Sequence, residues 1–238
     1  MTSHSANVVT QRDHNHQGRL MPEIGRYALP VEIDREDYQR NCPDEELHRQ
    51  ALEAFRSKAA ARYVISIHLC DQPSLYGFDQ DELVDSTCGY SVSGGLPGLT
   101  TSGMIDPSLP LMMVSAGIEK GAIKEMLLKE SGFQTLQPFH PTLLQMLTAE
   151  DKGSERIAVY LLHYLLKAIG EVAAVLTKVN GMIIFSDHPG WLRFSEVLLE
   201  NCSWMGFTPS KNMLHDQALT KLTTSESPHP AFFLIIRK

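Results

Sequence analysis

Positive charge is scarce in this chain of 238 residues, and its scarcity excludes several kinds of partner. The 21 Lys and Arg residues are outnumbered by 28 Asp and Glu residues, which gives a net charge of −7 at pH 7. No Lys or Arg lies between Arg62 and Lys120, and no basic run occurs elsewhere. Nucleic acids and anionic membranes are bound by clustered Lys and Arg. We therefore expect no nucleic-acid partner and no membrane partner.

Cysteine is also sparse, and its spacing argues against a metal or disulfide framework. The four cysteines are Cys42, Cys70, Cys88 and Cys202. They are widely separated and form no C-x-x-C pair, so neither zinc ligation nor a disulfide scaffold is expected. A reducing cytoplasm is the compartment that this usage favours.

The amino end has neither a basic start nor an apolar run, so it does not have the pattern of a secretory signal. Residues 1–20 are polar, and we expect them to form a flexible tail. His4, His14 and His16 lie in this tail, and we interpret them as solvated side chains rather than metal ligands.

One long apolar run, residues 157–179, is hydrophobic enough to suggest a transmembrane helix. His163, Lys167 and Glu171 recur in it every four residues, which places them in one polar stripe along a helix. This pattern favours the core helix of a soluble protein with one edge in water.

Strand patterns and helix patterns alternate over the rest of the chain. Segments rich in β-branched and aromatic residues predict strands at 61–69, 181–186 and 231–238. Helical patterns cover residues 44–60, 115–132 and 191–206, and the last two end at Gly132 and Gly206. This alternation predicts an α/β architecture with at least partly parallel strands.

Several motifs share their order and spacing with one protein family. They are "MPEIGRYALP" (21–30), "IHL" (67–69), "VDSTCGYSVSGGLPGLTTSGMIDP" (84–107), "KESGF" (129–133), "VNGMIIFS" (179–186) and "LLENCSWMGFTPSKN" (198–212). Together they resemble the acetate and propionate kinases. The resemblance runs from Met21 to the end of the chain, so we expect residues 21–238 to form one acetate-kinase-like lobe, the carboxyl-terminal one of the family.

The resemblance implies a fold and a chemistry. The family has two lobes of the actin and sugar-kinase (ribonuclease H-like) ATPase fold, each with a central mixed sheet flanked by helices. Its members transfer a phosphoryl group from ATP, with magnesium, to a short carboxylate bound between the lobes. The second lobe of the family carries its dimer contacts, so the expected partner is a second copy or an intact kinase of the family.

The resemblance also shows where this sequence departs from the catalytic pattern. Asn41 stands where the family has a transition-state histidine, and Thr101 stands where it has a phosphate-binding arginine. Neither residue supplies positive charge to a phosphoryl group in transfer. A weak remnant of the family's catalytic aspartate is Asp13.

The two phosphate-binding loops are altered as well. The family's His-Leu-Gly-Asn-Gly corresponds to residues 68–72, where Asp71 adds a negative charge between two residues that replace glycines. In residues 185–192, Asp187 repels an anion, Pro189 lacks an N–H donor and only Gly190 is retained. The carboxylate associated with magnesium is missing near the end of the chain, so we expect no metal site.

What remains of the family's cleft is a small set of residues. It comprises His68, Asp71, Asp85, Ser102, Asp187 and Gly190. Most of these have a structural explanation, as do Gly103 in a turn and Asp106-Pro107 at the start of a helix. His68 is the best candidate for contact with a ligand, and a hydrogen-bonded core histidine is the alternative. The adjacent Ser186, Asp187 and His188 cannot converge as a hydrolase triad.

Three functional hypotheses follow. The lobe is catalytically silent and acts by binding or oligomerisation, which is the interpretation that the altered residues favour. Alternatively, it belongs to a split acetate or propionate kinase, or it is a residual kinase that transfers the γ-phosphate of ATP to acetate. ATP and magnesium are the cofactors that any remaining activity requires, and we expect the chain to be inactive on its own.

Overall fold

The computed structural model describes residues 42–57, 60–91, 94–137, 140–149, 151–186 and 188–206. It also describes the backbone of two further strands, β5 (Leu214–His215) and β6 (Phe232–Arg237). The predictions for Asp13, Asn41 and Asp187, for the tail at 1–20 and for the motif at 21–30 lie outside the described residues.

A mixed sheet of six strands forms the centre of the molecule, in the order β3-β2-β1-β4-β6-β5. Its central strands are β1 (Tyr63–His68) and β4 (Gly181–Ser186), which are parallel to each other. All other neighbouring pairs are antiparallel. The expected mixed α/β architecture is therefore confirmed, as are the strands predicted around 61–69, 181–186 and 231–238.

Two strands were not predicted: β2 (Ser74–Asp79) and β3 (Glu82–Ser86). They form a hairpin on β1, and Gln80 closes its turn with a φ of 53°. Glycine and several acidic residues interrupt the β-branched pattern here, so the strands are formed by pairing with β1 rather than by local propensity.

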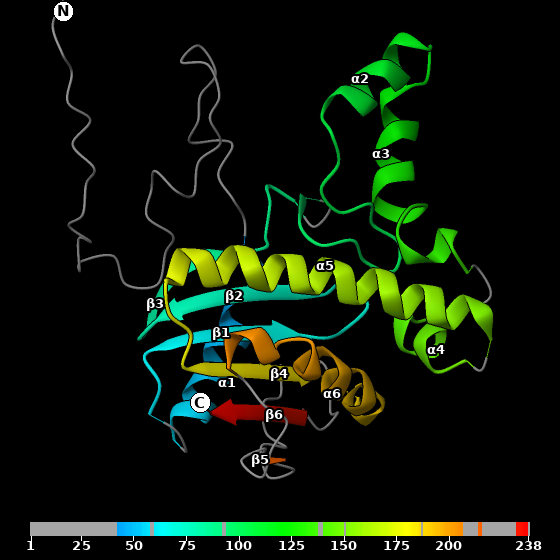
Figure 1. Cartoon of the computed structure of the whole chain (residues 1–238). Helices are drawn as coiled ribbons and strands as arrows, with labels where there is room; N and C mark the ends of the chain where they lie inside the picture. Colours follow the sequence, from blue (N-terminus) through cyan, green and yellow to red (C-terminus); the bar gives the residue numbers. More distant parts are fainter. Residues whose placement is uncertain are drawn as a thin grey trace, which may run out of the picture.

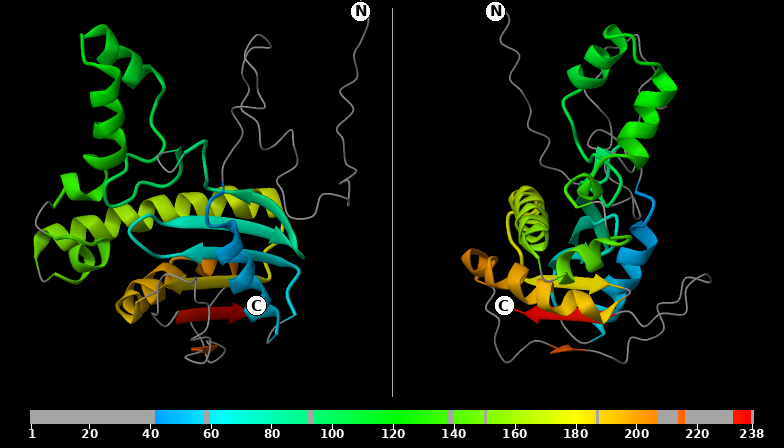
Figure 2. Two further views of the ribbon diagram at one scale, coloured as in Figure 1. Left: turned by 180° about the vertical axis from the view of Figure 1, so that it is seen from behind. Right: turned by 90° about the vertical axis from the view of Figure 1, so that its right-hand side faces the viewer.

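Helices cover both faces of the sheet (Figure 1). The helix α1 (Glu45–Arg56) packs on one face, and the long helix α5 (Lys152–Leu176) packs on the other. In the edge-on view of Figure 2, α5 and α1 lie on opposite sides of the sheet. The shorter helices α4 (Leu143–Thr148) and α6 (Leu192–Glu200) join the core on the α5 side.

The apolar run that we predicted to be a core helix is α5. It begins at Lys152 rather than Ile157, because the Asp151 carboxylate caps it by accepting the N–H of Ser154 at 2.9 Å. By length and composition alone, α5 is the one helix in the described part of the chain that could cross a membrane. A row of its apolar residues is nevertheless buried against the sheet, as expected for a core helix.

A helical hairpin projects from the sheet (Figures 1 and 2). It consists of α2 (Ser108–Ser115) and α3 (Lys120–Lys129). The prediction of one helix over 115–132 is wrong at its start, because Gly117 has a φ of 86° and breaks the chain between α2 and α3. Asp106 lies at the start of a helix as expected, since its Oδ1 accepts the N–H of Ser108, the first residue of α2, at 2.8 Å.

Candidate functional site

The candidate site lies where the carboxyl end of β1, the start of β2 and the amino end of α1 meet. His68 is the last residue of β1, Ser74 is the first of β2, and Asp44 precedes α1. A cavity of about 220 Å³ opens between them. Its lining residues are Pro43, Asp44, His68, Cys70, Gln72, Pro73, Ser74, Thr87, Cys88, Ser91, Gly95 and Leu96.

The Asp44 carboxylate is the centre of a polar cluster at this cavity. It accepts hydrogen bonds from the hydroxyls of Tyr76, at 2.6 Å, and Ser74. Its Oδ2 lies 3.5 Å from Nε2 of His48 and 4.0 Å from Nδ1 of His68. Burial alone would raise the pKa of Asp44, but hydrogen bonds from His48, His68 and Ser74 hold that pKa well below its ordinary value. Asp44 is therefore ionised at neutral pH.

His48 is the fully buried member of the cluster. Its Nδ1 is hydrogen-bonded to the Ser66 hydroxyl at 2.8 Å and its Nε2 to the Ser74 hydroxyl at 2.9 Å. The ring also stacks on Tyr76, with 4.0 Å between ring centroids. Burial lowers the pKa of His48 to about 4, although Asp44 opposes the shift, so this ring is neutral at pH 7.

His48 and Asp44 were missed by the sequence analysis. A signal was present, because His48 shares the apolar face of α1 with Ala51, Leu52 and Phe55. A histidine among core positions needs buried hydrogen-bond partners, but the sequence does not show which strands supply them.

His68 has the opposite protonation state. Its ring stacks on Phe185 with 4.7 Å between centroids, and its side chain is 16% exposed. Burial opposes protonation, but the adjacent Cys70 and the Asp44 carboxylate raise the pKa of His68 to about 10. His68 and Asp44 thus form an imidazolium–carboxylate pair at the cavity wall. Both interpretations of His68 keep support, since it is mostly buried and also lines the cavity.

Thr101, which the resemblance puts in place of an arginine, is part of a buried turn. Its Oγ1 accepts the N–H of Gly98 at 3.1 Å and is hydrogen-bonded to Oε1 of Gln72. The Gln72 amide in turn donates to the carbonyl of Leu96 at 2.9 Å. Thr101 therefore holds the loop together and does not line the cavity.

The other remnant residues are not brought together. The Asp71 carboxylate accepts the N–H of Leu143 at 2.8 Å, at the first turn of α4. The Ser102 hydroxyl donates to the carbonyl of Gly103 at 3.0 Å. The N–H of Gly190 is used locally as well, because it donates to Nδ1 of His188 at 3.0 Å. Each of these groups bonds within the protein, so none is an open phosphate contact.

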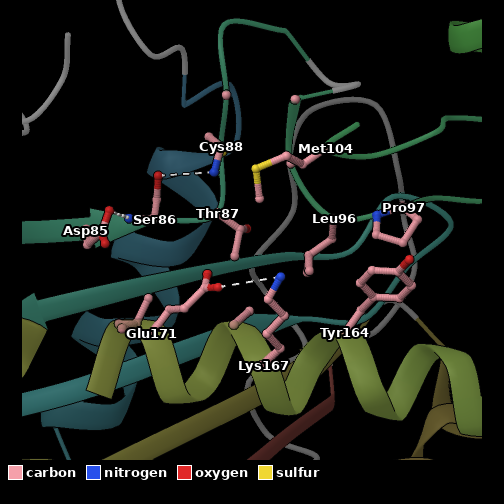
Figure 3. Close-up of a pocket in the computed structure, with 15 residues that line it drawn as sticks. Asp85, Ser86, Thr87, Cys88, Leu96, Pro97, Met104, Tyr164, Lys167 and Glu171 are labelled. Carbon is pink, nitrogen blue, oxygen red and sulfur yellow. Dashed lines mark hydrogen bonds and ion pairs between the residues drawn. The ribbon is translucent and has the colours of Figure 1, made fainter. Parts of the chain in front are cut away.

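Asp85 lines a second cavity of about 190 Å³, which lies between α5 and the loop that follows β3 (Figure 3). Its Oδ1 accepts the N–H of Ser86 at 2.8 Å. Lys167 and Glu171 form an ion pair of 3.9 Å on the α5 side of this cavity. Two members of the predicted polar stripe of α5 are thus placed at this wall.

The chemistry of the 220 Å³ cavity is constrained by its charges. One cation, His68, and one anion, Asp44, face each other, and the cavity has no Lys or Arg among its lining residues. In the part of the chain that the structure describes, no three His, Cys, Asp or Glu side chains are grouped so as to hold a metal ion. A polyphosphate would meet a paired cation and an ionised carboxylate here.

The mixed sheet with helices on both faces and a site at the strand ends defines the class as an actin/sugar-kinase-like lobe. The crystal structure of Porphyromonas gingivalis acetate kinase superimposes with a TM-score of 0.71 at 20% identity, over 79% of this chain and 50% of that one. Entamoeba histolytica acetate kinase gives a TM-score of 0.69 at 16% identity, over 84% of this chain and 53% of that one.

Sequence comparison identifies the family. The model of the acetokinase family matches residues 44–227, and the chain belongs to that family. It is 22% identical to the acetate kinase of Nitrobacter hamburgensis, over 82% of this chain and 50% of the relative. It is 24% identical to that of Methylocella silvestris, over 88% of this chain and 52% of the relative. The chain therefore spans about half the length of these relatives.

Proposed function

We propose that this acetokinase-family lobe is catalytically silent and acts by binding and self-association. The proposal rests on one observation, which is that the groups in the positions of the family's cations already have partners within the protein. The imidazolium of His68 is paired with Asp44, and Thr101 is hydrogen-bonded inside a turn. Among the described residues that line the cavity, no unpaired cation is left to balance the charge of a phosphoryl group in transfer.

The size of the expected loss in phosphoryl-transfer rate supports this proposal. An arginine that stabilises phosphoryl transfer is typically worth about 10³–10⁵ in rate, and a single oxyanion donor about 10²–10³. Thr101 cannot replace such an arginine, and the N–H of Gly190 is engaged by His188. These effects are not additive, but losing them together leaves little rate. The ionised Asp44 adds repulsion towards any phosphate that enters.

The second candidate is a residual or split acetate or propionate kinase, and membership of the acetokinase family favours it. In that case a first lobe, on another chain or in a longer form of this one, would complete the cleft. ATP and magnesium would be its cofactors and acetate its acceptor. For either candidate we propose a cytoplasmic location.

Two measurements on the purified protein separate the candidates. We expect no acetyl phosphate, trapped as hydroxamate, from ATP, magnesium and acetate, and no change in the melting temperature with millimolar ATP or ADP. Ligand at a hundredfold excess over its Kd would add about 2.7 kcal/mol of stability, which is readily seen as a shift. An acetate kinase of the family is the positive control. Turnover above the heat-inactivated sample, or a clear shift with nucleotide, would contradict the silent lobe.

Self-association is the second part of the proposal. The apolar side chains Leu109, Leu111, Met112 and Val114 of α2 are exposed, and α2 has no buried residue. The helix also carries no charged residue, so two copies can approach there although each chain has a net charge of −7. We assign this face to a second copy of the chain, with an intact kinase of the family as the alternative partner.

A further inference from the structure

Two thiols from distant parts of the chain meet beside the candidate site. Cys42 precedes α1, and Cys88 follows β3. Both are half-buried free thiols that pack against the same core cluster, and they are close enough for each to shift the pKa of the other. The Ser86 hydroxyl accepts the N–H of Cys88 at 3.3 Å (Figure 3). The same hydroxyl lies 3.3 Å from Sγ of Cys42. The Tyr76 hydroxyl lies 3.0 Å from Sγ of Cys88.

The surroundings of the two thiols make them chemically unequal. The hydrogen bond from Cys88 lowers the pKa of Cys42 to about 7 against the opposing effect of burial. The same contact and burial raise the pKa of Cys88 above its ordinary value. At neutral pH the pair therefore has one thiol that readily becomes a thiolate and one that stays protonated beside it. A nucleophilic thiol next to a resolving thiol is the arrangement found in redox-sensitive sites.

The other two cysteines lack this arrangement. Cys202 is fully buried in the core, and burial raises its pKa to about 12. Cys70 donates its S–H to the carbonyl of Gln72 at 3.0 Å and lies 3.6 Å from Nδ1 of His68, so its neighbours are a carbonyl and an imidazole. Cys202 and Cys70 therefore serve as internal controls for the reactivity of Cys42 and Cys88.

We propose that Cys42 and Cys88 form a reversible intramolecular disulfide when the protein meets a hydroperoxide. The Cys42 thiolate attacks one peroxide oxygen, the O–O bond breaks, and the departing hydroxide takes a proton and leaves as water. The sulfur of Cys88 then attacks the resulting sulfenic acid. The S–S bond forms, the S–O bond breaks, and the second oxygen leaves as water with the proton from Cys88. Two thiols are oxidised by two electrons, and one hydrogen peroxide is reduced to two waters.

The disulfide acts on the walls of both cavities. Cys88 lines the 220 Å³ cavity and the 190 Å³ cavity, and Thr87 beside it does the same. A bond to Cys42 ties this loop to the amino end of α1, next to Asp44. Oxidation therefore fixes the wall that the two cavities share, whether or not the lobe has any phosphoryl-transfer activity.

The test uses the purified full chain and hydrogen peroxide. After oxidation, the protein is unfolded in the presence of iodoacetamide, digested and analysed by mass spectrometry. We expect a linked peptide that contains Cys42 and Cys88, alkylated Cys70 and Cys202, and loss of the link after treatment with dithiothreitol. A disulfide that includes Cys70, or alkylation of both Cys42 and Cys88 after peroxide doses that oxidise other thiols, would overturn the proposal.

Three variants give independent readouts. Cys88→Ser should accumulate a sulfenic acid at Cys42 that dimedone labels, because its resolving thiol is gone. Cys42→Ser should leave Cys88 reduced at the same peroxide dose. Cys70→Ser is the matched control and should form the link as the parent protein does. Circular dichroism confirms that each variant is folded, and dimedone labelling of Cys88 in Cys42→Ser at the parent's rate would refute the assignment of Cys42 as the nucleophile.

Discussion

At the scale of single residues, one carboxylate holds two histidines in opposite protonation states. His48 lies inside the core, where the cost of burying charge exceeds the attraction of Asp44, and it stays neutral. His68 lies at the cavity wall, where Asp44 and Cys70 outweigh burial, and it stays charged. The difference comes from full burial and the neighbouring charge of His68, which lower the pKa of His48, and from Cys70 and Asp44, which raise the pKa of His68.

This arrangement predicts that the free energy of unfolding falls towards both acid and alkaline pH. We call these two parts of the pH profile the acid limb and the alkaline limb. The folded-state pKa of His48 is below its ordinary value of 6.5, so stability falls as pH drops from about 6.5 to about 4. The folded-state pKa of His68 is above that value, so its contribution is complete below about pH 6.5 and is lost as pH rises to about 10. From these two histidines alone, the free energy of unfolding in urea should be greatest near pH 6.5, and the lowered pKa of Cys42 should offset part of the alkaline loss between about pH 7 and 9. The contribution of Asp44 is present above its ordinary pKa and is lost only in stronger acid.

Variants show which residue causes the alkaline limb of the pH profile. His68→Gln should flatten the alkaline limb and leave the acid limb in place, since it removes only the charged ring. His163→Gln, on the exposed side of α5, is the matched control and should change neither limb. An alkaline limb that persists in His68→Gln would mean that another group causes it.

At the scale of elements, a glycine decides how closely α5 packs on the sheet. Gly77 lies in the middle of β2, and a Cβ there would overlap Cγ1 of Val172 on α5 and lie 3.4 Å from Cδ1 of Leu176. Val172 is buried and β-branched, so it cannot turn away easily. At Gly170 on the same helix, a Cβ would meet no atom within 4 Å, so space is free there.

The same substitution should therefore have opposite effects at these two glycines. Gly77→Ala should lower the free energy of unfolding by about 1–3 kcal/mol through overpacking. Gly170→Ala should raise it by about 0.5–1 kcal/mol, because alanine loses less backbone entropy in a helix interior. Urea unfolding of the two variants beside the parent protein measures both. Changes of the same sign would contradict this account of the α5 interface.

At the scale of the whole molecule, the exposed α2 face predicts self-association. Leu111 is 67% exposed, and Leu111→Glu should convert a dimer at micromolar concentration into a monomer in light scattering, because it places a charge opposite its own copy. Val159→Glu on α5, where Val159 is 65% exposed, is the control and should leave the assembly intact. A parent protein that is monomeric, or a dimer that only Val159→Glu disrupts, would contradict the assignment to α2.

Much of the fold could be predicted from local pattern. The strands β1 and β4 and the helices α1, α5 and α6 follow from β-branched runs and from apolar helical spacing. The hairpin of β2 and β3 could not, because Gly77 and its acidic neighbours have weak strand propensity and are held by pairing to β1. The start of α3 was misplaced because the positive φ of Gly117 is not visible in a helix-like composition.

The sequence by itself determined the family, the mixed α/β class and the lack of cations between Arg62 and Lys120, because these depend on residue identity and order. Only the tertiary structure decided that Asp44 meets His68 and that Cys42 meets Cys88. These residues are far apart in the chain, and the pairing of β1 with β2 together with the packing of α1 brings them together. Their charge states follow from burial and neighbours, which exist only once the sheet and its helices have assembled.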